Sequence, residues 1–65
     1  MTTPAEQIRE ARGRLSRAEA ARQTGLSLRS LEEWEAGRHE PNPLALPEIL
    51  RRLREAEARV LGTTA

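Results

Sequence analysis

The sequence predicts a compact all-α domain of four to five helices, with a long helix at its carboxyl end. The residues that favour helices, Ala, Leu, Arg and Glu, dominate the composition, and Trp34 is the sole aromatic residue. Helix-capping patterns recur along the chain, and apolar residues return at helical spacing. The 65 residues are enough for a single domain, 1–65, with a small core.

The first helix is expected to begin near residue 4. Residues 3–6 read Thr-Pro-Ala-Glu, a capping box with proline at the first helical position. The same spacing of a hydroxyl residue and a glutamate recurs at Ser16 and Glu19, where a second helix is expected to start. Gly13 lies between the two patterns and is expected to end the first helix.

Two short helices joined by a tight turn are predicted over residues 16–37. Ser16 caps the first of them, and Gly25 can adopt the left-handed conformation that ends a helix. Ser27 then caps a second helix over residues 28–36, which a further glycine ends. This order of elements is a helix-turn-helix, which presents its second helix to a DNA groove.

Leu31 and Trp34 lie three residues apart on the second of these helices, and Trp34 is expected to form the centre of the core. The last predicted helix, 47–61, carries an apolar stripe that is longer than so small a core can cover. We therefore expect its end to contact a second copy of the chain. The candidate dimerisation residues are Leu53, Ala56, Val60 and Leu61.

Charged residues alternate on the other side of this last helix. They are Arg51, Arg52, Arg54 and Arg59 with Glu48, Glu55 and Glu57. A solvated face linked by salt bridges is the preferred interpretation, and a surface that meets a partner protein is the alternative.

The composition excludes several classes of function. There is no cysteine, and a lone His39 among scattered glutamates makes a poor metal site, so neither a metal nor a cofactor is expected. No nucleophile–base pair or phosphate-binding glycine loop indicates an enzyme. No apolar run is long enough for a membrane span or a signal peptide, so we expect a cytoplasmic, nucleoid-associated protein. The net charge is only +1, so DNA binding would depend on where individual arginines lie.

The spacing of residues 15–41 resembles the DNA-binding domain of the phage repressor and Cro family, the lambda-repressor-like or XRE-type helix-turn-helix. The positions of the family pattern are occupied here by Leu15, Ser16, Arg17, Glu19, Ala20, Ala21, Gly25, Leu26, Ser27, Leu31, Trp34, Glu35, Gly37 and Pro41. Leu46 to Leu50 follow like the next helix of the family, so the resemblance covers about residues 4–54.

The sequence departs from the family pattern at three positions. Arg17 stands where glutamine is usual, and Ala20 where leucine is usual. The family also commonly carries an arginine six residues before the serine, able to pair with the glutamate of the next helix. Glu10 occupies that place here, with Arg9 one residue away, so the partner of Glu35 is left open.

The resemblance implies which residues contact DNA. Ser16 and Arg17, at the start of the first helix of the motif, would lie near a backbone phosphate, and Arg38 would contact a second one. Residues near the start of the second helix would enter the major groove. They are Ser27, Leu28, Arg29, Ser30 and Glu33.

Several of these side chains have a chemistry suited to the role. Arg29 can bind guanine through two hydrogen bonds, Leu28 can contact a thymine methyl group, and Ser30 a phosphate or a base edge. Glu33 can accept from a cytosine amino group, although phosphates would repel an unpaired carboxylate. Alternatively, Glu32 pairs with Arg29.

For two further residues the alternative is a surface role without DNA contact. Arg17 could be a solvated helix residue, and His39 is interpreted as an exposed loop residue.

Two functions remain open. The preferred one is a sequence-specific DNA-binding transcriptional regulator, a repressor of phage, plasmid or toxin–antitoxin type. It would bind a palindromic operator as a homodimer, with recognition helices about 34 Å apart. The alternative is a protein-interaction module that binds a polymerase subunit, a toxin or a host factor, which the small net charge and acidic helix 28–36 favour. DNA binding requires Arg17, Arg29 and Arg38 to form one positive face, undivided by Glu32 and Glu33.

Overall fold

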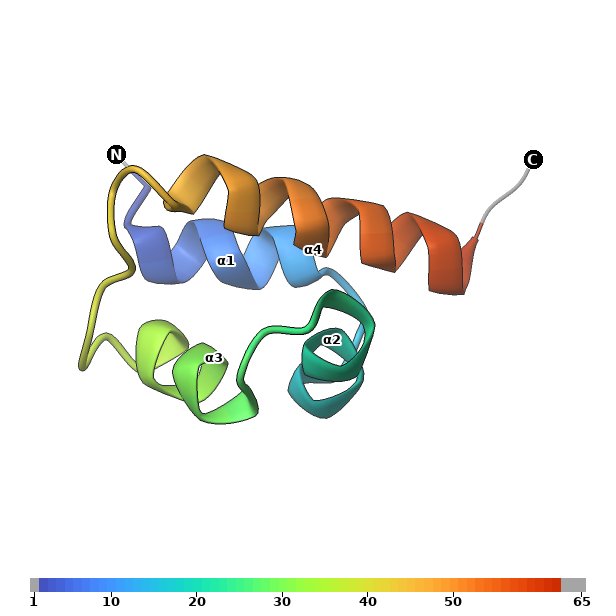
Figure 1. Ribbon diagram of the computed structural model, residues 1–65, viewed down its shortest axis with the longest axis horizontal. Helices are drawn as coiled ribbons and strands as arrows, with labels where there is room; N and C mark the ends of the chain where they lie inside the picture. Colours follow the sequence, from blue (N-terminus) through green and yellow to red (C-terminus); the bar gives the residue numbers. More distant parts are fainter. Residues whose placement is uncertain (1, 63–65) are drawn as a thin grey trace.

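The computed structural model describes residues 2–62, and within them it contains four helices and no strand. The helices are α1 (Pro4–Arg12), α2 (Arg17–Thr24), α3 (Leu28–Glu35) and α4 (Leu46–Leu61). α4 lies along α1 and runs in the same direction, while α2 and α3 pack below this pair (Figure 1). The predicted all-α class is confirmed, with four helices in the described part of the chain and α4 as the longest.

Side-chain caps begin the first three helices. At α1 both halves of the capping box form between Thr3 and Glu6. Ser16 accepts from the backbone N–H of Glu19 at 3.0 Å, but the Glu19 carboxylate accepts from Arg22 and Gln23 instead of returning to Ser16. The second predicted capping box is therefore only half formed, because the side chains one turn later are closer partners for the glutamate.

Each of the four helices contributes buried side chains to the core, and α4 contributes the most. Ile8, Leu31 and Leu53 are the largest fully buried side chains of the core. The smaller or peripheral members are Ala11, Leu15, Ala20, Ile49, Leu50 and Ala56. α1, α3 and α4 thus meet around three aliphatic residues rather than around an aromatic ring.

Trp34 is not the centre of the core, and that expectation was wrong. Its side chain is half-buried and packs against the core from outside. α3 has only eight residues, and Leu31, one turn earlier, is the side chain that it buries completely. The indole instead lines two surface hollows beside the segment that follows α3.

Gly13 joins α1 to α2 in a conformation that L-residues rarely adopt, with φ 61° and ψ −126°. A Cβ atom at this position would lie 2.8 Å from Cγ of Glu57 on α4. Gly25, between α2 and α3, also has a positive φ, of 78°, but faces open space. The α1–α2 connection is therefore restricted twice, by its backbone conformation and by the close approach of α4.

Gly13→Ala is expected to lower the free energy of unfolding by about 1–3 kcal/mol, because alanine disfavours this backbone conformation and Glu57 must move aside. The matched control is Gly13→Ala in a Glu57→Ala background, compared with Glu57→Ala alone, because it keeps the same backbone strain without the neighbouring side chain. Urea denaturation measures the loss in each background. Equal losses would show that the contact with Glu57 contributes nothing.

Candidate nucleic-acid interface

The start of α2 presents a hydroxyl group and a guanidinium group together. The Ser16 oxygen already accepts the Glu19 backbone N–H, so its own hydroxyl proton is free to be donated outward. The Arg17 side chain is 48% exposed, and its Nε lies 3.4 Å from Oε1 of Glu35. Arg17 therefore remains on the surface while Glu35 holds one side of its guanidinium group.

Glu35 pairs chiefly with Arg12, a contact that the sequence analysis missed. Arg12 donates from Nε to Oε2 of Glu35 at 2.8 Å and from Nη2 to Oε1 at 2.7 Å. Its Nη1 donates to the Leu15 carbonyl at 2.7 Å, and the two side chains are only 13% and 5% exposed. This fork-to-fork pair ties the end of α1 to the end of α3.

A signal for this pair was present in the sequence. Arg12 follows the buried Ile8 by four residues, so both side chains lie on the same face of α1. Arg9 and Glu10, the positions considered for the role, are exposed. The pairing arginine stands four residues before Ser16 rather than six.

The first turn of α3 carries the residues expected to enter a DNA groove. The Ser27 oxygen accepts the Ser30 backbone N–H at 3.2 Å, which fixes the start of the helix. Leu28 is 40% exposed. Arg29 is exposed, and within residues 2–62 no ion pair or side-chain hydrogen bond holds it, so the alternative Arg29–Glu32 pair does not form.

Arg29 lines a hollow of about 350 Å³ on the outer side of α3. Its other lining residues are Ser27, Ser30, Glu33, Trp34 and His39. An unpaired guanidinium group beside two hydroxyl groups can donate hydrogen bonds to a phosphate or to a base edge.

Glu33 is held by the segment that follows α3. Its carboxylate lies 3.4 Å from Nε2 of His39 and 3.8 Å from Nη1 of Arg38, and its side chain is 22% exposed. Its backbone carbonyl also accepts the N–H of Arg38 at 3.0 Å. His39 is exposed, as expected, but its contact with Glu33 was not foreseen. The Arg38 guanidinium group partly compensates the negative charge that would otherwise repel phosphates, while its side chain stays 72% exposed.

Glu32, on α3, stays unpaired within the described residues. It is exposed and lines a hollow of about 200 Å³ together with Arg17 and Arg9, and no ion pair within the described residues involves it. Arg17 and Arg29 therefore do not form the uninterrupted positive face expected of a DNA-binding surface, and this observation favours the protein-interaction alternative. Arginines and glutamates lie side by side on α2 and α3.

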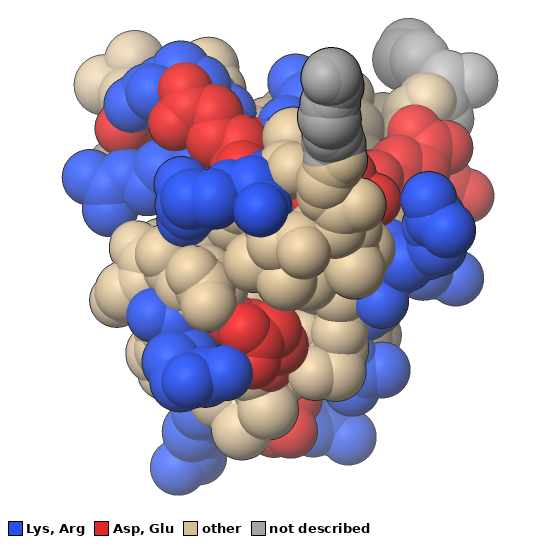
Figure 2. All heavy atoms as spheres, turned by 90° about the vertical axis from the view of Figure 1, so that its right-hand side faces the viewer, with Lys and Arg blue, Asp and Glu red and all other residues tan. Residues whose placement is uncertain are grey.

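The predicted dimerisation residues divide into two pairs. Leu53 and Ala56 are fully buried within the chain, where they pack in the core and leave nothing for a partner to contact. Val60 and Leu61 are 39% and 45% exposed. Figure 2 shows uncharged surface around the end of α4, with arginines on both sides of it.

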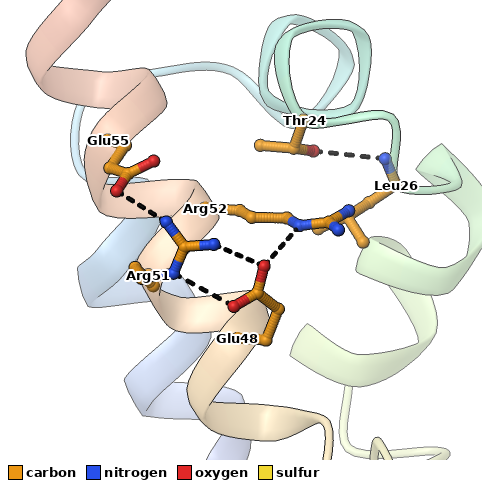
Figure 3. Close-up of polar contacts among 6 residues, drawn as sticks. All are labelled: Thr24, Leu26, Glu48, Arg51, Arg52 and Glu55. Atoms are coloured by element: carbon orange, nitrogen blue, oxygen red, sulfur yellow. Dashed lines mark hydrogen bonds and ion pairs between the residues drawn. The ribbon is translucent and has the colours of Figure 1, made fainter.

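Salt bridges cover the outer face of α4, as predicted. Arg51 donates to Glu48 at 3.0 and 2.5 Å and to Glu55 at 2.7 Å, and Arg52 Nε donates to Glu48 at 3.0 Å (Figure 3). Hydrogen bonds from Arg51 and then Arg52 hold the pKa of Glu48 below its ordinary value. Arg54 makes no such pair within residues 2–62, and Arg59 instead donates to the Gln23 carbonyl at 3.4 Å.

Comparison with known proteins agrees with this geometry. A family model described as helix-turn-helix (HTH_3) matches residues 6–61, which include all of α2, α3 and α4 and most of α1. No curated protein and no solved structure matches the chain. Within the described residues no helix is long and apolar enough to cross a membrane. The chain therefore belongs to the XRE or lambda-repressor-like helix-turn-helix family, a family of DNA-binding regulatory domains.

Proposed function

We propose that this protein is a sequence-specific transcriptional repressor that reads operator DNA through the first turn of α3. The observation that carries this proposal is Arg29, which is exposed on that turn and has no partner within residues 2–62. A guanidinium group that is not paired with a carboxylate can bind the O6 and N7 atoms of guanine together, which is the commonest specific contact in the major groove. Leu28 beside it offers an apolar contact for a thymine methyl group.

Phosphate contacts on both sides of α3 would hold this turn in register. At the start of α2, Ser16 and Arg17 can donate to one phosphate. Beyond the end of α3, Arg38 can donate to another phosphate, because its side chain is largely exposed. The family membership and these three donors support binding to the DNA backbone, and Arg29 supplies the sequence preference.

A domain of this size contacts too few base pairs to select one site, so we propose that it acts as a homodimer on a palindromic operator of phage, plasmid or toxin–antitoxin type. Of the four predicted dimerisation residues, Leu53 and Ala56 are buried, and only Val60 and Leu61 lie on the surface, at the end of α4.

Selection from a random duplex-DNA library at low and at moderate salt tests the proposal. We expect an enriched palindromic motif whose affinity falls steeply with salt, because each phosphate contact releases counterions. Absence of enrichment by folded protein at low salt would refute the proposal.

Arg29→Ala should relax the preference at one base pair of the selected motif and weaken binding to it by about 1–3 kcal/mol. Arg17→Ala should weaken binding evenly across sequences and lower the salt slope by about one. Arg54→Ala is the matched control, since Arg54 is exposed on α4 and has no ion pair within the described residues. Fluorescence anisotropy on a series of single-base variants measures all three. Identical sequence-independent losses for Arg29→Ala and Arg17→Ala would refute base reading by Arg29.

A protein-interaction module is the second candidate, and the exposed Glu32 favours it. This carboxylate lies in the same hollow as Arg17, so the face offers both charges to a protein partner such as a polymerase subunit, a toxin or a host factor. Glu32→Gln separates the two functions. Removing the negative charge should tighten DNA binding, whereas it should weaken binding to a protein whose basic group pairs with Glu32.

A further inference from the structure

An apolar groove lies between the end of α3 and the start of α4. It has a volume of about 400 Å³, and its apolar walls come from Leu26, Trp34, Pro41, Ala45 and Ile49. Pro41 and Ile49 are buried, whereas Leu26 and Trp34 are half-buried and turn part of their surface to this groove. No side chain of residues 2–62 fills the groove, although most of its walls are apolar.

Leu44 stands beside this groove without entering it. Its side chain is 91% exposed, the most exposed large apolar side chain of the described chain. The groove is lined by residues on both sides of Leu44 in the sequence, Asn42 and Ala45, but not by Leu44 itself. An exposed apolar side chain therefore lies in the same short connection as two residues that line an apolar recess.

Hydrogen bonds to Asn42 hold the turn that carries Leu44. The Asn42 side-chain carbonyl accepts the Leu44 N–H at 2.8 Å, and the Asn42 backbone carbonyl accepts the N–H groups of Ala45 and Leu46 at 2.8 and 3.0 Å. Pro43 fixes one further backbone angle. Binding through Leu44 would thus require little ordering of the backbone.

We propose that a second copy of this chain docks on this surface, with the Leu44 side chain of each copy in the apolar groove of the other. A two-fold axis makes such a contact closed and self-complementary, because projection and recess belong to one patch. The contact between the copies does not depend on DNA binding, and only the role of the dimer on DNA rests on the proposed function.

The charges around the groove suit a second copy. Its polar lining includes Glu48 and Arg52, which pair within one chain at 3.0 Å (Figure 3). Both are about half exposed, so each can also face the opposite charge across a two-fold axis. A patch that carries one carboxylate and one guanidinium group is complementary to itself, whereas a uniformly acidic or basic partner would meet a like charge.

The position of the groove also suits paired recognition helices. The molecule is 35 Å long, and Figure 1 places α3 and the segment after it at one end and the C-terminal end of α4 at the other. Copies joined at Leu44 bring their α3 helices toward the middle of the dimer. If the copies were joined through Val60 and Leu61 instead, the two α3 helices would lie toward the far ends of the dimer. Successive major grooves on one face of DNA are only about 34 Å apart.

Sedimentation equilibrium over a wide range of protein concentration tests the contact without DNA. Leu44→Glu should raise the dimer dissociation constant roughly a hundredfold or more, because two apolar side chains are lost from a symmetric interface. Leu44→Met should dimerise like the unmodified chain, since its side chain has a similar volume and polarity. The double variant Val60→Ser with Leu61→Ser is the matched control at the other end and should also dimerise normally.

Each other outcome overturns the proposal. They are an unmodified chain that stays monomeric at every concentration, a Leu44→Glu variant that dimerises normally, and loss of the dimer in the Val60→Ser, Leu61→Ser variant. At a concentration where both proteins are monomeric, a thermal melt of Leu44→Glu should match that of the unmodified chain, because the Leu44 side chain is exposed.

A separate DNA arm uses the selected palindrome and its half-site. Leu44→Ser, which adds no charge, should bind the half-site with unchanged affinity and lose cooperative binding to the palindrome. Equal cooperativity in both proteins would overturn the proposal. Failure of all DNA binding would instead refute the proposed function and leave the sedimentation result standing.

Discussion

Leu53→Ala is expected to remove a large part of the free energy of unfolding of this protein. Leu53 is fully buried where α1, α3 and α4 meet, so its truncation leaves a cavity and costs about 2–5 kcal/mol. A domain of this length has a total stability of only roughly 3–10 kcal/mol at typical values per residue. Circular dichroism during urea or thermal denaturation measures the loss.

Leu44→Ala is the matched control for this experiment. It removes the same atoms from a side chain that is 91% exposed rather than fully buried, and the stability of the monomer should hardly change. Trp34→Ala should lie between the two, at about 1–2 kcal/mol, since the half-buried indole loses only part of its contacts. A Leu53→Ala protein as stable as Leu44→Ala would contradict the assignment of the core.

Glu35→Ala is expected to cost about 2–4 kcal/mol, the second-largest effect. It leaves the Arg12 guanidinium group, whose side chain is only 13% exposed, without the carboxylate that accepts two of its hydrogen bonds. Removal of one partner from a buried pair typically costs about 3–5 kcal/mol, and the remaining exposure of Arg12 lowers that figure. Urea denaturation at neutral pH measures it.

Glu32→Ala is the control, because Glu32 lies on the same helix but is exposed and has no ion pair within residues 2–62. Replacing both members, Arg12→Met with Glu35→Met, should recover much of the loss, since no buried charge is then left uncompensated. If Glu35→Ala costs no more than Glu32→Ala, the pair between α1 and α3 does not stabilise the fold.

The Arg12–Glu35 pair also affects the candidate interface. Glu35 lies 3.4 Å from Arg17, so the ion pair that holds α1 to α3 also restricts the guanidinium group proposed to meet a phosphate. Leu53 has no such link to the surface. Glu35→Ala therefore changes the surroundings of Arg17 as well as the stability of the fold, whereas Leu53→Ala changes the stability alone.

The sequence by itself determined the local elements. Hydroxyl caps at Thr3, Ser16 and Ser27 and glycines after the helices specify where the chain turns, because these effects act over three or four residues. The spacing of residues 15–41 likewise identified the helix-turn-helix and its family, which the match over residues 6–61 confirms.

Only the tertiary structure decided which side chains meet across helices. Arg12 pairs with Glu35 from 23 positions away, Leu53 and Ala56 are buried in the chain's own core, and Trp34 lies at its edge. Periodicity places a residue on a helix face, but the packing of four short helices determines how much of that face is covered. For the same reason the groove beside Leu44 has no signature in the sequence, since its walls come from α3, α4 and the two connections next to them.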